Sequence, residues 1–259
     1  MKKQTALVTG ASGGIGKAIA EQFAKDGYDL VISARNLAQL QSLASSWQQT
    51  YKVKVLAIAA DLSQPLAAEE LYKEVKRQQI VITHLVNNAG YGLFGFFDKL
   101  DHTQQLAMLQ LNIISLTSLA KLFLPDLLAQ RGRMMNVAST AAFQPGPLMA
   151  AYYASKAYVL SLSEALAEEL SDQGVSVTAF CPGPTISGFQ DKASMQDSGL
   201  IKGKKLPGSE EVGLAGYRAM MTGKRVYIHG FGNWLTAQLV RFSPRAMVTK
   251  LVKLISLPV

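Results

Sequence analysis

Apolar residues occur in this chain as short continuous runs, separated by longer segments in which they recur three or four positions apart. The continuous runs have the length of buried strands, which predicts strands at residues 5–8, 28–34, 53–59, 80–86, 132–137, 175–180 and 225–229. The helical spacing predicts helices after Gly16 and at residues 37–51, 65–79, 101–130, around 152 to 172, and 210–221. Strands that alternate with helices predict a single α/β domain with a Rossmann-type, doubly wound parallel sheet of about seven strands.

The first predicted strand ends in a glycine-rich turn, Thr9-Gly10-Ala11-Ser12-Gly13-Gly14-Ile15-Gly16, and a helix follows this turn. Glycines let the backbone approach a pyrophosphate closely, and the free N–H groups at the start of a helix stabilise its negative charge. A plain tight turn is the alternative. The strand before the turn and the helix after it favour a dinucleotide site.

Four residues that could contact a ligand lie at the carboxyl ends of predicted strands, namely Gly10, Arg35, Asp61 and Asn87. In open parallel sheets, ligands bind beyond these ends. Arg35 stands where many NAD sites have a carboxylate for the ribose 2′-hydroxyl, and an arginine accommodates a 2′-phosphate instead. We therefore expect NADP (NADPH) rather than NAD, with an ordinary exposed arginine as the alternative.

Tyr152 and Lys156 are four residues apart in a predicted helix, and positions at this spacing share a helix face. A tyrosine hydroxyl ordinarily loses its proton only near pH ~10, so a proton-transfer role at neutral pH needs a positive charge nearby. Lys156 is placed to supply that charge. The pair alone is also compatible with two ordinary residues on a solvated helix face.

Composition narrows the class of protein. The 259 residues are 49% hydrophobic and 17% charged, which fits a globular chain and not a disordered one. The single cysteine, Cys181, excludes an internal disulfide, and no Cys/His cluster has metal-ligand spacing, so we expect no metal and a reducing compartment. The N-terminal apolar run is too short for a signal peptide, and no stretch reaches ~18 uninterrupted apolar residues, so we expect a cytoplasmic protein without a spanning helix.

The net charge of +8 is concentrated near the C-terminus. Residues 1–190 carry 15 basic and 14 acidic side chains, whereas residues 191–259 carry 11 and 4. This distribution disfavours nucleic-acid binding, which needs a basic face on the main domain. Residues 231–259 form a basic amphipathic extension divided by Pro244, and residues 233–259 suit an anionic membrane surface. They equally suit a helical arm that packs on a neighbouring subunit or covers the substrate pocket.

Taken together, the motifs resemble those of the short-chain dehydrogenase/reductase family, over nearly the whole chain. The matching elements are Thr9-Gly10-x-x-x-Gly14-Ile15-Gly16, Asn87-Asn88-Ala89-Gly90, Asn112, Ser139, Tyr152-x-x-x-Lys156 and Pro182-Gly183. Ser139 lies thirteen residues before Tyr152, as the family pattern requires, and this spacing selects Tyr152 over Tyr153. The resemblance implies a catalytic domain at residues 1–230 and a homodimer or homotetramer, because relatives pair the helices around Asn112 and Tyr152 across a two-fold axis.

The resemblance also implies a role for each catalytic residue. Tyr152 would exchange a proton with a carbonyl or alcohol oxygen, and Lys156 would lower the tyrosine pKa and hold the nicotinamide ribose. Ser139 would hydrogen-bond the substrate oxygen, and Asn112 would hold a water that relays protons from Lys156. With Tyr152 and Lys156, the implied cofactor-binding residues are Gly10, Ser12, Gly13, Gly14, Ile15, Gly16, Arg35, Asp61, Leu62, Asn87, Ala89, Gly90, Pro182, Gly183 and Thr185. Gly13 departs from NADP-preferring relatives, which often carry a basic residue there, so Arg35 would hold the 2′-phosphate largely alone.

Three segments that flank the sheet edge are expected to select the substrate, namely residues 91–97, 143–149 and 185–206. Phe94, Phe143 and Met149 are expected to join Ser139 and Tyr152 in an apolar pocket for a small-molecule carbonyl or alcohol. The alternative is that some of the aromatic residues belong to the core or to subunit contacts. A fatty-acyl ketone, a steroid-like ring ketone and a xenobiotic carbonyl all fit this expectation. The alternative, an idle NADP-binding sensor or scaffold, would have lost the tyrosine or the lysine. The polar segment between Gly188 and Ser209 is expected to be a mobile loop.

Overall fold

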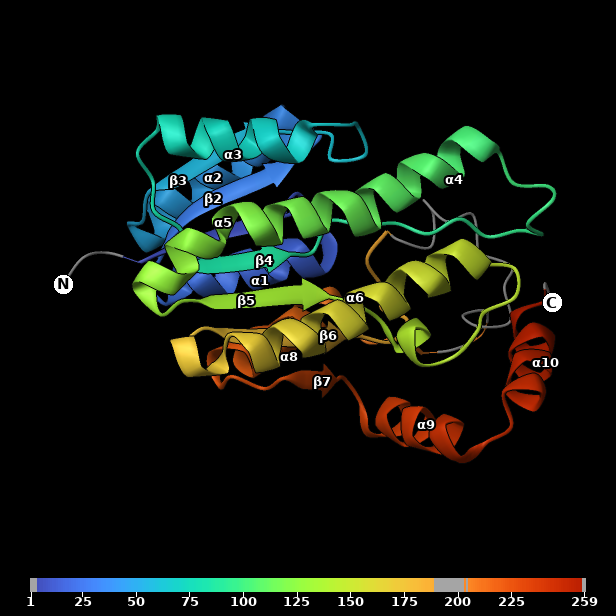
Figure 1. The fold of residues 1–259 in the computed structure, drawn as a ribbon. Coiled ribbons are helices and arrows are strands. Elements are labelled where there is room, and N and C mark those ends of the chain that lie inside the picture. The colour runs from blue at the N-terminus through green and yellow to red at the C-terminus, as the bar shows by residue number, and fades with distance from the viewer. Residues whose placement is uncertain (1–3, 189–202, 204, 258–259) are drawn as a thin grey trace.

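The computed structural model describes residues 4–188, 203 and 205–257. Its centre is a seven-stranded sheet in which every neighbouring pair is parallel, in the order β3-β2-β1-β4-β5-β6-β7 (Figure 1). The strands are β1 (Thr5–Thr9), β2 (Asp29–Ala34), β3 (Val55–Ala59), β4 (His84–Asn87), β5 (Arg133–Val137), β6 (Ser176–Cys181) and β7 (Val226–Ile228). The predicted Rossmann-type fold with about seven strands is therefore confirmed.

Helices cover both faces of the sheet, because the five central strands β2, β1, β4, β5 and β6 have buried side chains on both sides. On one face, α1 (Gly14–Lys25), α2 (Leu37–Tyr51) and α8 (Ser209–Met221) enclose a core that includes Phe23 and Tyr217. On the other face, α3 (Ala67–Arg77), α5 (Leu116–Gln130) and α6 (Ala150–Glu169) enclose a core around Leu71 and Phe123. These two cores hold the carboxyl ends of the strands in one fixed row.

The helix predicted at residues 101–130 is present, but it is not regular. It consists of α4 (His102–Leu109), a π-helical turn (Gln110–Ser115) and α5. Asn112 lies inside the π-helical turn and is buried. Such turns are rare and are frequent at functional sites. Apolar spacing over so few residues cannot distinguish a π-helical turn from an α-helical one, so the sequence did not predict it.

One helical stretch in the described chain, His102–Gln130, is long and apolar enough to cross a membrane, judged by length and composition alone. The search for uninterrupted apolar runs missed it, because polar residues interrupt the stretch. Leu119, Phe123 and Leu127 of this stretch are buried in the core beside β4 and β5. Packing against the sheet therefore accounts for much of its apolar character.

Other boundaries differ from the predictions by a few residues. β4 begins at His84, not at residue 80, because the Ile80 N–H still bonds the Val75 carbonyl at the end of α3. Two short 3₁₀ helices, Thr140–Phe143 and Ser171–Gln173, complete the main elements. The expected mobile loop after Gly188 lies largely outside the described residues.

The C-terminal segment forms two helices, α9 (Phe231–Phe242) and α10 (Arg245–Ser256). The break between them falls at Ser243 and Pro244, as the proline predicts. Figure 1 shows both helices beyond β7, at the end of the molecule where the strands have their carboxyl ends. The C-terminal segment is thus placed beside the edge at which ligands of such sheets bind.

Candidate active site

The glycine turn after β1 is closely packed against the end of β4. A side chain at Gly16 would place its Cβ 2.3 Å from Asn88 Nδ2 and 2.4 Å from the Gly10 carbonyl oxygen, so this position requires glycine. Gly10 has a φ of +66°, a conformation that other residues rarely adopt. Asn88 Nδ2 donates a hydrogen bond of 2.9 Å to the Thr9 carbonyl. The turn therefore has a fixed shape and leads directly into α1, whose first N–H groups suit an anion.

A cavity of about 1230 Å³ lies beyond the carboxyl ends of the strands and extends from the glycine turn to α10. Single-ligand pockets usually measure about 300–1,000 Å³, so this cavity has room for a dinucleotide and a further molecule. Within the described residues, its charged lining groups are Arg35, Asp61 and Lys156. All three lie at the sheet edge, and the lining contributed by α9 and α10 carries no charge.

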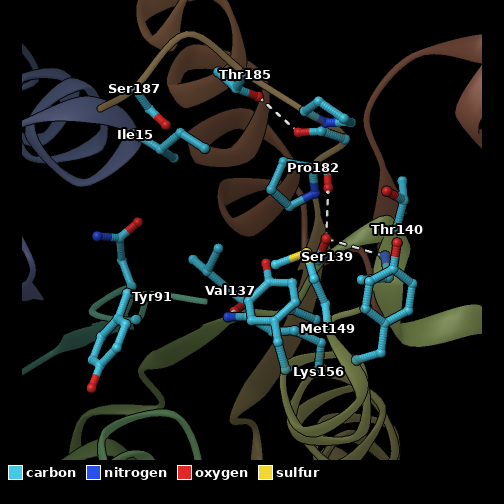
Figure 2. Close-up of a pocket in the computed structure, with 18 of the residues that line it drawn as sticks. Ile15, Tyr91, Val137, Ser139, Thr140, Met149, Lys156, Pro182, Thr185 and Ser187 are labelled. Carbon is cyan, nitrogen blue, oxygen red and sulfur yellow. Dashed lines mark hydrogen bonds between the residues drawn. The ribbon is translucent and has the colours of Figure 1, made fainter. Parts of the chain in front are cut away.

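Ser139, Tyr152 and Lys156 converge on this cavity. The Ser139 hydroxyl accepts a hydrogen bond from the Ala141 N–H at 3.1 Å, donates to the Pro182 carbonyl at 3.4 Å, and also bonds the Tyr152 side chain. Lys156 Nζ lies 5.8 Å from the centre of the Tyr152 ring and donates to the Val137 carbonyl at 2.8 Å. Figure 2 shows Ser139 and Lys156 directed into one space, with Ile15, Thr185 and Ser187 on its far side.

Burial controls the ionisation of this pair. Desolvation raises the pKa of the Tyr152 hydroxyl well above its ordinary value, although the hydrogen bond with Ser139 acts to lower it. Burial also lowers the pKa of Lys156 to about 8. Desolvation is therefore the largest influence on the tyrosine hydroxyl in this structure, and the expected lowering of its pKa by Lys156 stays a prediction.

Asn112 lies behind the cavity and joins the loop after β4 to helix α6. Its Nδ2 donates to the Tyr91 carbonyl at 3.0 Å and to Ser155 Oγ at 3.1 Å, while its Oδ1 accepts from the Tyr91 N–H at 3.2 Å. Both amide protons are therefore used within the protein. The expected water held by Asn112 stays a prediction, and the side chain itself positions Tyr91 and Ser155.

The residues near the end of β2 provide a setting for the adenosine part of a dinucleotide. Arg35 is exposed and lines the cavity. Burial raises the pKa of the Asp61 carboxyl, but hydrogen bonds from Ser63 and the charge of Arg35 together hold the pKa below its usual range. No described atom lies within 4 Å of a Cβ added at Gly13, so the basic residue found there in some relatives would fit but is absent.

Most of the predicted site residues line this one cavity. With Ser139, Tyr152 and Lys156, the lining includes Gly10, Ser12, Gly13, Gly14, Ile15, Gly16, Arg35, Asp61, Leu62, Ala89, Gly90, Met149, Pro182, Gly183 and Thr185. This agreement supports a dinucleotide site, since the glycine turn and the strand ends together form its cradle.

Three other predicted residues do not line the cavity. Asn87 is buried in the sheet, where its Nδ2 donates to Asn136 Oδ1 at 2.9 Å. Asn88 lines the cavity at the position that was expected for Asn87. Phe94 packs against the cluster around Met108, and Phe143 packs against the cluster around Leu116. The expectation that these two phenylalanines line the substrate pocket is therefore wrong for this structure.

The sequence reasoning underestimated the C-terminal helices. Met247, Val248, Leu251, Val252 and Ile255 lie on one face of α10 and line the cavity, together with residues of α9 such as Ala237 and Val240. This arrangement matches the alternative in which the extension covers the substrate pocket. The signal in the sequence was the apolar stripe at helical spacing between residues 247 and 255.

Comparison with known proteins shows the family of the chain. The family model for short chain dehydrogenases matches residues 4–198. A short-chain dehydrogenase from Sphingobium yanoikuyae in complex with NADPH superimposes with a TM-score of 0.82, has 31% identity, and covers 92% of this chain and 94% of its own.

Two curated relatives match about two thirds of the chain. Hydroxysteroid dehydrogenase-like protein 1 of Gallus gallus is 36% identical over 181 residues, which is 68% of this chain and 54% of that protein. Very-long-chain 3-oxoacyl-CoA reductase-A of Danio rerio is 33% identical over 182 residues, 68% of this chain and 56% of that protein. The match thus spans about half the length of these relatives. By its family match, its fold and these relatives, the chain belongs to the short-chain dehydrogenase/reductase family of oxidoreductases.

Proposed function

We propose that the protein is an NADP(H)-dependent oxidoreductase that interconverts a hydrophobic carbonyl compound and its secondary alcohol. The observation that carries this proposal is the convergence of Ser139, Tyr152 and Lys156 on a cavity whose other end is the glycine turn. A proton donor and a dinucleotide cradle in one cavity are what carbonyl reduction by hydride transfer needs.

In the proposed reduction, Tyr152 donates its hydroxyl proton to the carbonyl oxygen, and NADPH supplies the hydride. Ser139 donates a hydrogen bond to the same oxygen, which stabilises the negative charge that develops there. The ammonium group of Lys156 stabilises the phenolate left on Tyr152. Because burial disfavours that phenolate, Tyr152 keeps its proton until the substrate oxygen accepts it.

The preference for NADP rests on the end of β2. Arg35 is the cationic group on the described cavity wall next to the glycine turn, and a guanidinium matches phosphate oxygens with paired hydrogen bonds. The similar Sphingobium protein, solved with NADPH, supports this choice. With glycine at position 13, Arg35 would bind the 2′-phosphate without a second basic side chain from the turn.

A hydrophobic substrate is proposed from the apolar side chains that line the cavity. Met149, Met247 and Leu251 face the cavity, and α10 contributes only apolar side chains to it. The names of the two curated relatives refer to a hydroxysteroid and to a very-long-chain 3-oxoacyl-CoA, both of which are large and mainly apolar, and this supports a substrate of that kind. An uncharged wall favours the apolar part of such molecules.

The test is to incubate the purified protein with NADPH and a panel of carbonyl compounds, and to follow the loss of NADPH absorbance. The panel contains a long-chain 3-oxoacyl thioester, a steroid-like ring ketone and a small hydrophilic ketone. We expect turnover with at least one of the bulky apolar compounds and little with the hydrophilic one. Tight NADPH binding without turnover of any compound would contradict the proposal and would favour an idle cofactor-binding protein.

A further inference from the structure

The side of α9 that faces away from the cavity is apolar and exposed. Phe231, Trp234, Leu235 and Phe242 occupy this side, with exposed fractions of 76%, 46%, 42% and 88%. The rings of Phe231 and Trp234 stack with their centres 5.8 Å apart. None of these four described residues lines the cavity, so substrate or cofactor contact does not explain their exposure. We call these four residues the α9 outer face.

The side of α10 that faces away from the cavity is basic. Arg245, Lys250 and Lys253 are exposed there, and Leu254 lies among them with 69% of its surface exposed. Arg241 adds a fourth exposed basic group at the end of α9. The sequence from residue 231 to 259 contains no acidic side chain. We call Arg245, Lys250, Lys253 and Leu254 the α10 outer face.

The two outer faces meet at the Ser243–Pro244 corner, where Phe242 and Arg245 flank the break between the helices. Exposed aromatic and aliphatic side chains beside basic groups alone are typical of helices that lie on an anionic lipid surface. We propose that the α9 and α10 outer faces together form a docking surface for an anionic lipid bilayer. This inference goes beyond the proposed function, since docking requires no turnover.

Charge argues for lipid and against a second copy of the chain as the occupant. A symmetric dimer through this surface would bring the same patch of both subunits together. Arg241, Arg245, Lys250 and Lys253 would then face the same basic patch of the other copy, with no acidic side chain of either extension to pair with them. Like charges across an interface cost binding energy, whereas anionic lipid headgroups are complementary to all four groups.

Docking at this corner would place the bilayer close to the cavity. The inner side of α10 lines the cavity, so its outer face and the cavity wall are two sides of one helix. Figure 1 shows α9 and α10 at the carboxyl-end corner of the molecule, away from α2 and α3. A bilayer in contact with this corner would lie next to the substrate half of the cavity and leave the rest of the molecule in water.

The test is sedimentation of the full-length protein with vesicles of phosphatidylcholine alone, or of phosphatidylcholine mixed with phosphatidylglycerol. We expect binding to the anionic vesicles at low salt and release as added salt screens the charges. The double variant Arg245→Gln/Lys253→Gln should weaken binding by about 25-fold, because each basic residue near an anionic surface contributes a factor of about five. The double variant Phe242→Ser/Leu254→Ser should weaken it as well.

Matched controls lie on the opposite side of the molecule. Leu66, at the start of α3, has 67% of its surface exposed, nearly the value of Leu254, so Leu66→Ser should leave vesicle binding unchanged. Lys54→Gln/Lys73→Gln removes two exposed charges outside the C-terminal segment and should have little effect. Equal losses in these controls would show that binding follows net charge or apolarity alone, which would overturn the proposal.

Two further results would overturn it. One is the absence of sedimentation with anionic vesicles at low salt. The other is a change in oligomer size, by light scattering, in the Phe242→Ser/Leu254→Ser variant, which would assign the surface to contact between copies. Turnover of a water-soluble carbonyl by each variant shows that it has folded. If the wild-type protein binds vesicles but reduces no carbonyl compound, the proposed function fails while this inference stands.

Discussion

Tyr152 and Tyr153 are adjacent and both border the cavity, yet their surroundings differ. Tyr152 is hydrogen-bonded to Ser139, whereas the ring of Tyr153 packs over Gly146, where an added Cβ would lie only 2.2 Å from the ring. We predict that Tyr152→Phe lowers kcat by about 10²- to 10⁴-fold, because the ring stays while the transferable proton is lost. NADPH binding, measured by fluorescence titration, should change by no more than a few-fold.

Tyr153→Phe is the matched control, since it removes a hydroxyl one position away in the same helix. It should leave kcat nearly unchanged. Similar losses of kcat in the two variants would contradict the choice of Tyr152 as the proton donor.

The ionisation of Lys156 predicts how the reaction depends on pH. Burial lowers the pKa of this amine to about 8, so it is charged below that pH and neutral above it. The phenolate that forms on Tyr152 during reduction loses its stabilising charge once Lys156 is neutral. We therefore predict that kcat/KM for the reduction is constant below about pH 7 and falls as the pH rises through 8. A Lys156→Arg variant keeps its positive charge above pH 8, so any activity that it retains should not fall in this pH range. A wild-type kcat/KM that stays constant well beyond pH 8 would contradict the role of the Lys156 charge.

Arg35 predicts the choice of cofactor at the level of one side chain. If its guanidinium binds the 2′-phosphate, Arg35→Ala should raise the KM for NADPH about tenfold or more, the usual effect of losing a charge-assisted hydrogen bond. The KM for NADH should change little, because NADH lacks that phosphate. Steady-state kinetics with both cofactors measure this, and a wild-type enzyme that prefers NADH would refute the assignment.

At the scale of elements, the strands and helices could be predicted because their periodicities are strong. The runs at Leu7 and Val8 or at Val31 and Ile32 are buried on both faces of a parallel sheet, and such strands read as continuous apolar segments. The strand ends, and with them Gly10, Arg35 and Asp61, followed from the same alternation.

The interior of the site was less predictable, because it depends on side-chain contacts between distant segments. Asn87 and Asn88 are two consecutive asparagines. Because successive side chains of a strand point to opposite faces, Asn87 bonds Asn136 within the sheet and Asn88 lines the cavity. Phe94 and Phe143 are apolar residues near the carboxyl ends of the strands, but they pack against clusters of buried residues and do not line the cavity. Periodicity shows which residues are buried but not which buried cluster they join.

The position of α10 leads to a prediction about substrate size. Leu251 lies on the cavity side of this helix, whereas Leu254 lies on the other side with 69% of its surface exposed. We predict that Leu251→Trp raises the KM for a bulky apolar carbonyl about tenfold, since overfilling a packed site costs roughly 1–3 kcal/mol, and that it leaves a small carbonyl unaffected. Leu254→Trp adds the same ring outside the cavity and should change neither KM for soluble substrates. A tenfold effect in both variants would mean that the tryptophan disturbs α10 as a whole.

At the scale of the whole molecule, a second apolar surface lies on α4, the π-helical turn and α6. Leu106 and Ile114 are each 52% exposed, and their spacing of eight residues places them on one face of the helix. Thr117 and Tyr158 hydrogen-bond to each other at 3.0 Å, which joins this face to α6. The surface includes no residue of α9 or α10, so self-association here and lipid docking at the C-terminal corner can occur together.

We predict that the protein forms a homodimer or homotetramer through this α4–α6 surface. A two-fold axis would bring Leu106 of both subunits close together, so Leu106→Lys places like charges in an apolar contact and should shift the protein toward the monomer. Light scattering at micromolar concentration measures the mass of wild type and variant. Leu66→Lys, at a leucine at the start of α3 that is more exposed than Leu106, should leave the mass unchanged, so that loss of association in Leu106→Lys alone locates the interface. A monomeric wild-type protein at this concentration would exclude the assembly, and Leu106 and Ile114 would then be exposed for a reason other than subunit contact.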